Sequence, residues 1–438
     1  MNRGYRDHRP TGDRPRKHGS MAPPLGDIVE RISRDDLSDE DVSAKIQNVK
    51  FIASYNWVSS SSPKIIIPGQ PPKWTPLKGS TRLPGDSGDY YRDINAAFYP
   101  KHPMEPAIVS VMKMHPEPIP ISIVACGSSI GNLLRFARGV DLDNCFRILV
   151  EKIGNTVHFI RRENAPDETI KGIHGFGHTF PEAYTTWDPS VKRSKSHQRI
   201  LSYQFAGFDL LVRFEGDGYI PEASEKSNVR SFKGDDLDQI QDLGVSEPSP
   251  NTTDPLVVAE GGDAIPQTSI FDLKTRSVRT RHKDHLGEQL PRLWISQMTN
   301  FLLAYHERGQ FQEKDIEIKN IKSDVEEWQD LNQPSLNRLA ALFRRILDSA
   351  RASKDGKLEV VWSGYGSLEI RQQLPDAGEA LSTSVKKQWE AWLGAGVKEA
   401  DAGDSGRWED FMATLSDSDE QSDYAACDAE CGYCGKCT

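Results

Sequence analysis

Residues 210–217 read Leu210-Leu211-Val212-Arg213-Phe214-Glu215-Gly216-Asp217, an apolar run that ends in two acids. A second run reads Ser269-Ile270-Phe271-Asp272-Leu273-Lys274 and ends in an acid and a lysine with the same spacing. Side chains two residues apart in a strand point to the same face of a sheet. We therefore expect each charged pair to project together from the end of its strand, and the two strands to be neighbours.

Carboxylates in such apolar surroundings need counter-charges or metal ions, because burying them unpaired is very costly. Mg²⁺ and Mn²⁺ prefer oxygen ligands of this kind and can activate water beside a phosphate. A lysine nearby would orient that water or neutralise the phosphate. The acid, acid-x-Lys pattern resembles the active site of the PD-(D/E)xK nuclease superfamily. The alternative, strand ends whose charges are merely solvated, stays open for either segment alone.

The surrounding sequence predicts an α+β domain with mostly antiparallel mixed sheets flanked by helices. Two hairpins are expected, one at 146–161 around Gly154-Asn155 and one at 200–220 turning at Ala206-Gly207. Other strands are expected at 51–58, 64–68, 119–125, 268–276, 315–321, 357–362 and 367–371. Apolar periodicity predicts helices at 129–138, 288–307, 335–350 and 384–393.

Composition divides the chain into four parts. Residues 1–45 lack an apolar period and are expected to be a disordered tail. Residues 46–374 form the predicted domain, in which 234–265 is a flexible acidic insertion with eight acids and no Lys or Arg. Residues 375–426 are expected to be a linker with a helix and an acidic stretch, and 427–438 a cysteine-rich, disordered tail.

The composition excludes a membrane protein and a secreted protein. No stretch approaches the roughly 18 apolar residues of a membrane helix, and the first 24 residues lack the hydrophobic segment of a secretory signal. An intracellular protein is expected, without a membrane partner. The basic run Arg14, Arg16, Lys17 favours the nucleus over the cytoplasm, unless it is only a solvated tail. The net charge of −10 is concentrated at 234–265 and 401–438, so it does not argue against a nucleic-acid substrate.

The order of the motifs resembles the decapping nuclease (DXO-type) family, within the PD-(D/E)xK superfamily, as a divergent, fungal-like member. The matching segments are residues 122–127 with 132–134, the hairpin at 145–160, Gly175-Phe176-Gly177-His178-Thr179-Phe180-Pro181-Glu182, Glu215-Gly216-Asp217, Asp272-Leu273-Lys274, Trp294-Ile295-Ser296-Gln297, and 301–309. Members of that family remove aberrant or NAD caps from RNA 5′ ends. The resemblance spans residues 51–373.

The resemblance implies roles for individual residues. Metal ions, Mg²⁺ or Mn²⁺ in one or two positions, would be held by Glu215, Asp217, Asp272, the carbonyl of Leu273 and, as a further carboxylate, Glu182. Lys274 and Gln297 would contact the scissile phosphate and its water, and Glu215 is the third catalytic residue. Asp272 stands where the family usually has Glu.

One departure from the family pattern affects recognition of the 5′ end. The arginine of the family's Arg-Gly motif is replaced by Cys126, before Gly127. Arg135 or Arg138 could substitute for it, although a surface role is the alternative for both. The change puts RNA 5′-end binding in doubt more than hydrolysis.

Four of the six cysteines, Cys427, Cys431, Cys434 and Cys437, cluster at the C-terminus. Four thiolates could bind one structural Zn²⁺ in a tetrahedral site. An Fe–S cluster and an unstructured, redox-labile tail are the alternatives.

Two functions therefore compete. The first is a metal-dependent hydrolase that acts on RNA 5′ ends by removing aberrant or nucleotide caps, by releasing 5′ pyrophosphate or by 5′–3′ exonucleolytic cleavage. The second is a catalytically impaired relative that binds RNA ends or scaffolds a 5′–3′ exoribonuclease partner. A DNA-acting nuclease of the same superfamily is a further alternative.

Overall fold

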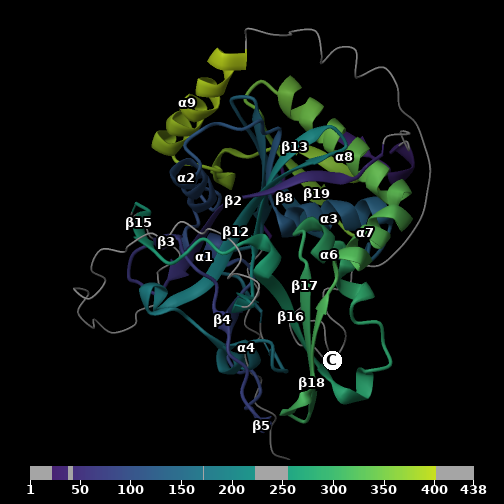
Figure 1. The fold of residues 1–438 in the computed structure, drawn as a ribbon. Coiled ribbons are helices and arrows are strands. Elements are labelled where there is room, and N and C mark those ends of the chain that lie inside the picture. Colours follow the sequence, from purple (N-terminus) through teal and green to yellow (C-terminus); the bar gives the residue numbers. More distant parts are fainter. Residues whose placement is uncertain (1–21, 38–42, 171, 222–254, 401–438) are drawn as a thin grey trace, which may run out of the picture.

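The computed structural model describes residues 22–37, 43–170, 172–221 and 255–400. They form two large β-sheets with helices on both sides (Figure 1). None of the helices in these ranges is both long and apolar enough to cross a membrane. The predicted α+β class with mixed, mainly antiparallel sheets is confirmed.

The larger sheet contains eleven of the described strands. Most neighbours are antiparallel, but β13 and β9 flank β7 in parallel, and β3 and β15 are also parallel. In spatial order the strands are β1 (Ile28–Ile32), β20 (Leu368–Gln372), β19 (Lys357–Trp362), β8 (Phe146–Ile153), β9 (Thr156–Arg162), β7 (Ile123–Cys126), β13 (Phe208–Glu215), β12 (Ser194–Phe205), β2 (Ile46–Val58), β3 (Lys64–Pro68) and β15 (Val257–Gly261).

The second sheet contains seven described strands, with β16 and β17 parallel at its centre. Their order is β11 (Thr185–Thr186), β4 (Lys73–Trp74), β14 (Gly218–Tyr219), β16 (Ile270–Ser277), β17 (Asn300–Glu307), β18 (Gln310–Asn320) and β5 (Ser80–Arg82). A separate pair joins β6 (Tyr90–Tyr91) to β10 (Thr169–Ile170). The chain passes from the first sheet to the second between β13 and β14, where the acid-Gly-acid motif lies.

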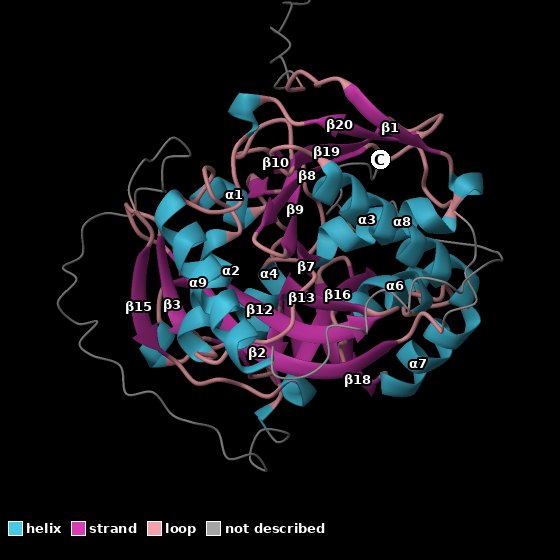
Figure 2. Ribbon diagram, turned by 90° about the horizontal axis from the view of Figure 1, so that it is seen from above, coloured by secondary structure: helices cyan, strands magenta, loops and turns pink. Residues whose placement is uncertain are grey.

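The helices lie in two groups on opposite sides of the larger sheet (Figure 2). One group consists of α3 (Gly127–Arg138), α6 (Leu290–Ile295), α7 (Lys322–Leu331) and α8 (Gln333–Ala352). The other consists of α1 (Ile94–Phe98), α2 (Glu105–Met114) and α9 (Thr383–Ala400). The short helix α4 (Thr179–Tyr184) packs its aromatic residues against the second sheet. Short 3-10 turns include η1 (Arg34–Asp36), η2 (Pro189–Val191), η4 (Gln267–Ser269), η5 (Val278–Thr280), η6 (Gly287–Gln289) and η7 (Pro375–Ala377).

Both predicted hairpins are confirmed. Strands β8 and β9 pair antiparallel around Gly154-Asn155, and β12 pairs with β13. The second turn places Ala206 at φ 49° and Gly207 at φ 82°. Two consecutive left-handed residues give the tight turn whose twist matches that of the flanking strands.

The predicted long helix at 288–307 is wrong. The structure has the short helix α6, which ends before Gln297 at φ 47°, and then strand β17. Residues 300–305 are buried without a polar face, because the side chains on one face of β17 pack in the main core and those on the other face pack with the aromatic residues of α4. A central strand covered on both faces reads as a continuous apolar run, which periodicity alone does not separate from a buried helix.

The predicted domain limits were too narrow at both ends. Strand β1 lies inside the segment expected to be a disordered tail, and it pairs with β20 at the edge of the larger sheet. Helix α9 lies beyond residue 374 and buries Trp389 completely against the larger sheet. Strand β15 falls within the predicted acidic insertion, whose residues 234–254 are outside the described ranges, as are 1–21 and 401–438.

The inclusion of β1 in the domain can be tested by comparing two of its side chains. Ile32 is completely buried, whereas Val29 is 53% exposed. Ile32→Ala is expected to lower the free energy of unfolding by about 2–4 kcal/mol, because it removes buried methylenes and leaves a cavity. Val29→Ala is expected to change it by less than about 0.5 kcal/mol. Equal, small changes in chemical denaturation would show that the strand does not contribute to the core.

Candidate active site

The candidate site lies where the chain crosses between the two sheets. Strand β13 ends at Glu215, and β14 begins at Gly218. A Cβ at Gly218 would overlap the ring of Phe271 and lie 2.8 Å from the carbonyl oxygen of Pro72, so only glycine allows this close approach. The register pairs Gly218 with Phe271 in β16, which brings Asp217 next to Asp272.

Asp217 is held in place by the neighbouring strand. Its Oδ2 accepts a hydrogen bond from the backbone N–H of Leu273 at 2.6 Å. The N–H and C=O of one strand residue point to the same side, so the Leu273 carbonyl also faces Asp217. Burial, followed by the charge of Asp272, raises the pKa of Asp217 to about 6, although Lys274 and Arg292 oppose this. The two aspartates are therefore close electrostatic neighbours.

Asp272 is 1% exposed and forms a bidentate ion pair with Arg292 of α6. Arg292 Nη2 donates to Asp272 Oδ1 at 2.6 Å and Nη1 donates to Oδ2. The same guanidinium also donates to Gln289 Oε1 at 3.2 Å. Both carboxylate oxygens of Asp272 are thus engaged by one cation, and the sequence had given no indication of this pairing.

Lys274 shares the face of β16 with Asp272, as the i, i+2 spacing predicted. Burial and the nearby Arg292 lower the pKa of Lys274 to about 8, while Asp272 and Asp217 act in the opposite direction. At neutral pH the amine is still mostly protonated. It supplies a second cation beside the two aspartates.

Glu215 lies at the edge of this cluster. Burial and the charge of Asp217 raise its pKa to about 7, against a hydrogen bond from Gln198 on the paired strand β12. The side chain of Glu215 is nevertheless exposed. Its carboxylate is therefore accessible to solvent while it interacts with the charge of Asp217. A carboxyl group with a pKa near 7 can both accept and release a proton at neutral pH.

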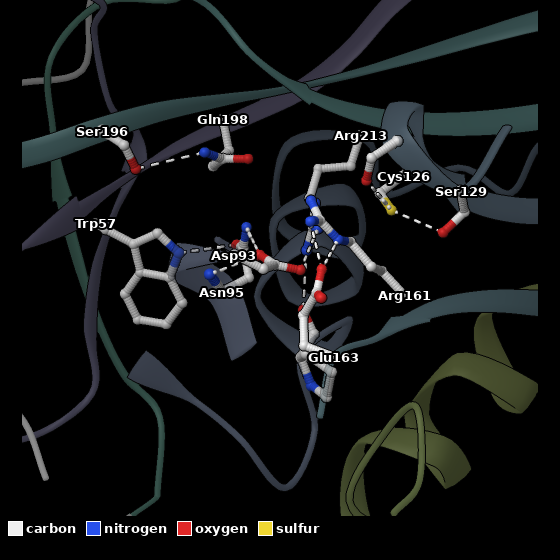
Figure 3. A network of polar contacts seen from close by, with 12 residues as sticks. Trp57, Asp93, Asn95, Cys126, Ser129, Arg161, Glu163, Ser196, Gln198 and Arg213 are labelled. Carbon is white, nitrogen blue, oxygen red and sulfur yellow. Dashed lines mark hydrogen bonds and ion pairs between the residues drawn. The ribbon is translucent and has the colours of Figure 1, made fainter. Parts of the chain in front are cut away.

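A network of buried polar groups lies next to Glu215, since the charges of its members Asp93 and Arg213 act on the pKa of Glu215. Figure 3 shows this network. Asp93 lies 3.8 Å from Arg213 and accepts a hydrogen bond from the backbone of Asn95 at 2.9 Å. Asn95 in turn accepts bonds from the Tyr55 hydroxyl at 2.5 Å and the Trp57 indole at 2.8 Å. Burial alone would raise the pKa of Asp93, but Arg213 and Arg161 outweigh it and lower the pKa.

The network also surrounds Cys126, where the family's arginine is missing. Arg213 is the register partner of Cys126 across β13 and β7, and the Cys126 Sγ lies 3.0 Å from the Ser129 hydroxyl. Arg161 also interacts electrostatically with Cys126, so two guanidinium groups flank this position. Arg135 and Arg138, by contrast, are 7% and 2% exposed, so a surface role for them is wrong.

Two predicted site residues have their described contacts elsewhere. Gln297 Nε2 donates to the carbonyl of Trp294, in the last turn of the preceding helix α6, at 2.6 Å. Glu182 is exposed on α4, and its charge acts on Tyr90, whose pKa is raised by burial, by Asp86 and by Glu182. The four cysteines of the predicted zinc site lie outside the described residues.

The carboxylates of Asp217 and Asp272 and the Leu273 carbonyl are the type of ligand that a divalent metal ion prefers, but they are not arranged around a common metal position. Carboxylates and a main-chain carbonyl are the ligands that Mg²⁺ and Mn²⁺ prefer. Among the residues that the structure describes, however, no three acidic, histidine or cysteine side chains are placed to hold a metal together. The Arg292 guanidinium takes both oxygens of Asp272. In this conformation Asp272 is therefore not available to a metal.

Comparison with known proteins identifies the family. Residues 28–365 match the model described as Domain of unknown function (DUF8563). The chain belongs to this family. Searched against curated proteins, the sequence gives no match.

The DUF8563 domain has the fold of Rai1 structures. Rai1 from Scheffersomyces stipitis, in complex with (3′-NADP)⁺ and a calcium ion, superimposes with a TM-score of 0.52 and 11% identity, over 83% of this chain and 100% of that one. Rai1 from S. pombe gives a TM-score of 0.50 and 10% identity, over 79% and 99%. The resemblance to the decapping nucleases that the motif order predicted is confirmed at the level of the fold.

The raised pKa of Asp217 predicts how stability depends on pH. Because its folded-state pKa, about 6, lies above the ordinary value, the folded protein binds more protons between about pH 4 and 6, and stability falls as pH rises through this window. Asp217→Asn lacks this loss. In metal-free buffer, its free energy of unfolding relative to that of the wild type is expected to rise by about 2–3 kcal/mol from pH 4 to pH 7, because one pKa unit corresponds to about 1.4 kcal/mol. Melting temperatures of both proteins, measured at each pH, check this. A difference that stays constant or falls would contradict the burial of a charged Asp217.

Proposed function

We propose that this DUF8563 member binds RNA 5′ ends at the junction of the two sheets and hydrolyses a phosphate bond there. One observation carries the proposal: Asp217, Asp272 and Lys274 lie in mutual electrostatic contact beside Glu215, which titrates near neutral pH. Perturbed carboxylates and a lysine in one cluster are typical of sites built for acid–base chemistry. Structural ion pairs at strand ends would not require a solvent-accessible glutamate of this kind.

Each residue has a role that follows from its position. Lys274, mostly cationic at neutral pH, would neutralise charge on the bound phosphate. Glu215, with a pKa of about 7, would take the proton of the attacking water. Asp217 and the Leu273 carbonyl, with Asp272 only if Arg292 releases it, would hold Mg²⁺ or Mn²⁺, which when bound lowers the pKa of water and stabilises negative charge on phosphate oxygens.

The structural neighbours support a nucleotide and a divalent cation as ligands. The S. stipitis Rai1 structure holds (3′-NADP)⁺ and calcium on the same fold. We propose cap removal, 5′-pyrophosphate release or 5′–3′ exonucleolytic cleavage as the reaction of the present chain. Gln297 would reach the phosphate only after releasing the Trp294 carbonyl, and Glu182, exposed on α4, would be an additional carboxylate.

A second candidate function is favoured by two specific features. Cys126 stands where the decapping nucleases have the arginine of their Arg-Gly motif, and Arg292 already neutralises Asp272. A member that binds RNA ends without hydrolysing them, or that scaffolds a 5′–3′ exoribonuclease partner, would retain the fold while tolerating both changes. We place it second because the solvent-accessible Glu215 has no obvious structural purpose.

The two functions are separated by a panel of RNAs that differ only at the 5′ end. Triphosphate, unmethylated cap, NAD cap, monophosphate and hydroxyl ends are incubated with the protein and Mg²⁺ or Mn²⁺, together with a DNA strand of the same sequence. We expect turnover of at least one RNA end, and the preferred end names the substrate. Binding of RNA ends without turnover would establish the second function, and cleavage of DNA alone would point to a DNA nuclease.

A further inference from the structure

We propose that Arg292 is a built-in competitor of the metal ion at Asp272. Its guanidinium fills the cation position in the free protein, and a divalent metal binds only when this side chain withdraws toward solvent. The inference rests on the proposed function for the use of a metal, but it concerns the protein's own cation and is tested by metal binding rather than by activity.

The first argument is the way Arg292 satisfies Asp272. The carboxylate is 1% exposed, and such a buried charge requires a counter-ion. A bidentate guanidinium pairs with both oxygens and uses the planar geometry that makes Arg–carboxylate pairs strong. A metal that coordinates Asp272 needs at least one of these oxygens. The two cations therefore exclude each other.

The second argument is the local charge balance. Asp217 and Asp272 are matched by Lys274 and Arg292, whose charges act on the same two carboxylates. Adding a divalent ion to this balanced group would place it beside two like charges. Withdrawal of Arg292 removes one of them, and the phosphates of an RNA 5′ end would compensate for the rest. We therefore expect weak metal binding by the free protein.

The third argument is that Arg292 is able to leave. Its side chain is 40% exposed, although the carboxylate that it contacts is buried. The side chain also donates to Gln289, one turn earlier, at 3.2 Å. Asp272 is fixed in β16, a central strand of the second sheet. Arg292 extends from the short helix α6 and is partly exposed to solvent. Only the side chain of Arg292 has to move for a metal ion to reach Asp272.

The test is a calorimetric titration of Mn²⁺ into wild-type protein and Arg292→Ala without RNA. We expect the dissociation constant for Mn²⁺ to fall at least tenfold in Arg292→Ala. Arg281→Ala is the matched control, because Arg281 is 46% exposed and also pairs with a nearly buried aspartate, Asp315, at 2.8 Å on the second sheet. It is expected to bind Mn²⁺ as the wild type does.

Thermal stability supplies a second readout. Without metal, Arg292→Ala should melt below the wild type, because Asp272 has lost its counter-ion, and Mn²⁺ should raise its melting temperature more than that of the wild type. Arg292→Gln keeps much of the side chain without the charge and replaces the alanine variant if that one does not fold. Equal or weaker Mn²⁺ binding by the folded variant would overturn the proposal.

The competition between Arg292 and Mn²⁺ and the proposed hydrolysis of RNA can fail separately. Tighter Mn²⁺ binding by Arg292→Ala without hydrolysis of any RNA end would support the competition and defeat the hydrolase. Hydrolysis by the wild type, with the same Mn²⁺ affinity in both proteins, would support the hydrolase and defeat the competition.

Discussion

Asp217→Asn is expected to lower the rate of RNA 5′-end hydrolysis by at least about a hundredfold. The substitution removes one negative charge from the centre of the cluster and keeps the size of the side chain. The amide oxygen can still accept the hydrogen bond from Leu273 N–H, so the strand crossover at Gly218 should be retained. RNA affinity should change much less than the rate, since Asp217 itself repels phosphate.

The matched control for this prediction is Asp209→Asn. Asp209 lies at the start of β13, the strand that precedes Asp217, and accepts a hydrogen bond from Gln204 at 3.0 Å, away from the cluster. Its replacement should leave the rate within about twofold of the wild type. If Asp217→Asn retained full activity while remaining folded, the reaction would have to take place elsewhere in the molecule.

Trp389→Ala is expected to lower the free energy of unfolding by about 3–5 kcal/mol. The indole is completely buried, stacks on Trp392 with ring centroids 4.7 Å apart, and donates to the Thr156 hydroxyl at 3.2 Å. Removing it leaves a large cavity between α9 and the larger sheet. Chemical denaturation measures the effect directly.

Gln388→Ala is the control for the tryptophan, because Gln388 is the exposed neighbour on the same helix. It should change the free energy of unfolding by less than about 0.5 kcal/mol. A loss below about 1 kcal/mol in Trp389→Ala would mean that α9 is an appendage. The predicted boundary at residue 374 would then be nearer the truth.

Local patterns predicted the elements whose neighbours lie close in the sequence. The helix expected at 335–350 is α8, whose buried Leu336, Leu339 and Phe343 repeat at helical spacing. The hairpins were correct because their turns contain residues that tolerate a left-handed backbone. The helix expected at 288–307 failed because both faces of β17 are covered by packed side chains, and its apolar run therefore carries no period of its own.

The N-terminal strand was missed for a related reason. Residues 28–32 read Ile-Val-Glu-Arg-Ile, too short and too polar to stand out from the tail. They become ordered by pairing with β20, more than 300 residues later, and by burying Ile32. Such long-range pairing leaves no signal in the local sequence.

The candidate site was predicted in part. The acid and lysine spacing identified Asp217, Asp272 and Lys274, which the fold brings together. Arg292 was missed because its carboxylate partner is twenty residues away and lies on a different element. Arg213 had a visible signal, a charge inside an apolar strand, and its partner Asp93 could be found only in three dimensions.

The central claim is that the cluster around Asp217 is a hydrolytic site for RNA 5′ ends, and single-turnover product analysis tests it most directly. Excess wild-type protein is mixed with 5′-labelled RNA and Mn²⁺, and the released fragment is identified by mass, with Asp217→Asn in parallel. We predict a fragment from the 5′ end with the wild type and none with Asp217→Asn. Intact RNA bound to the wild type, or equal product from both proteins, would contradict the claim.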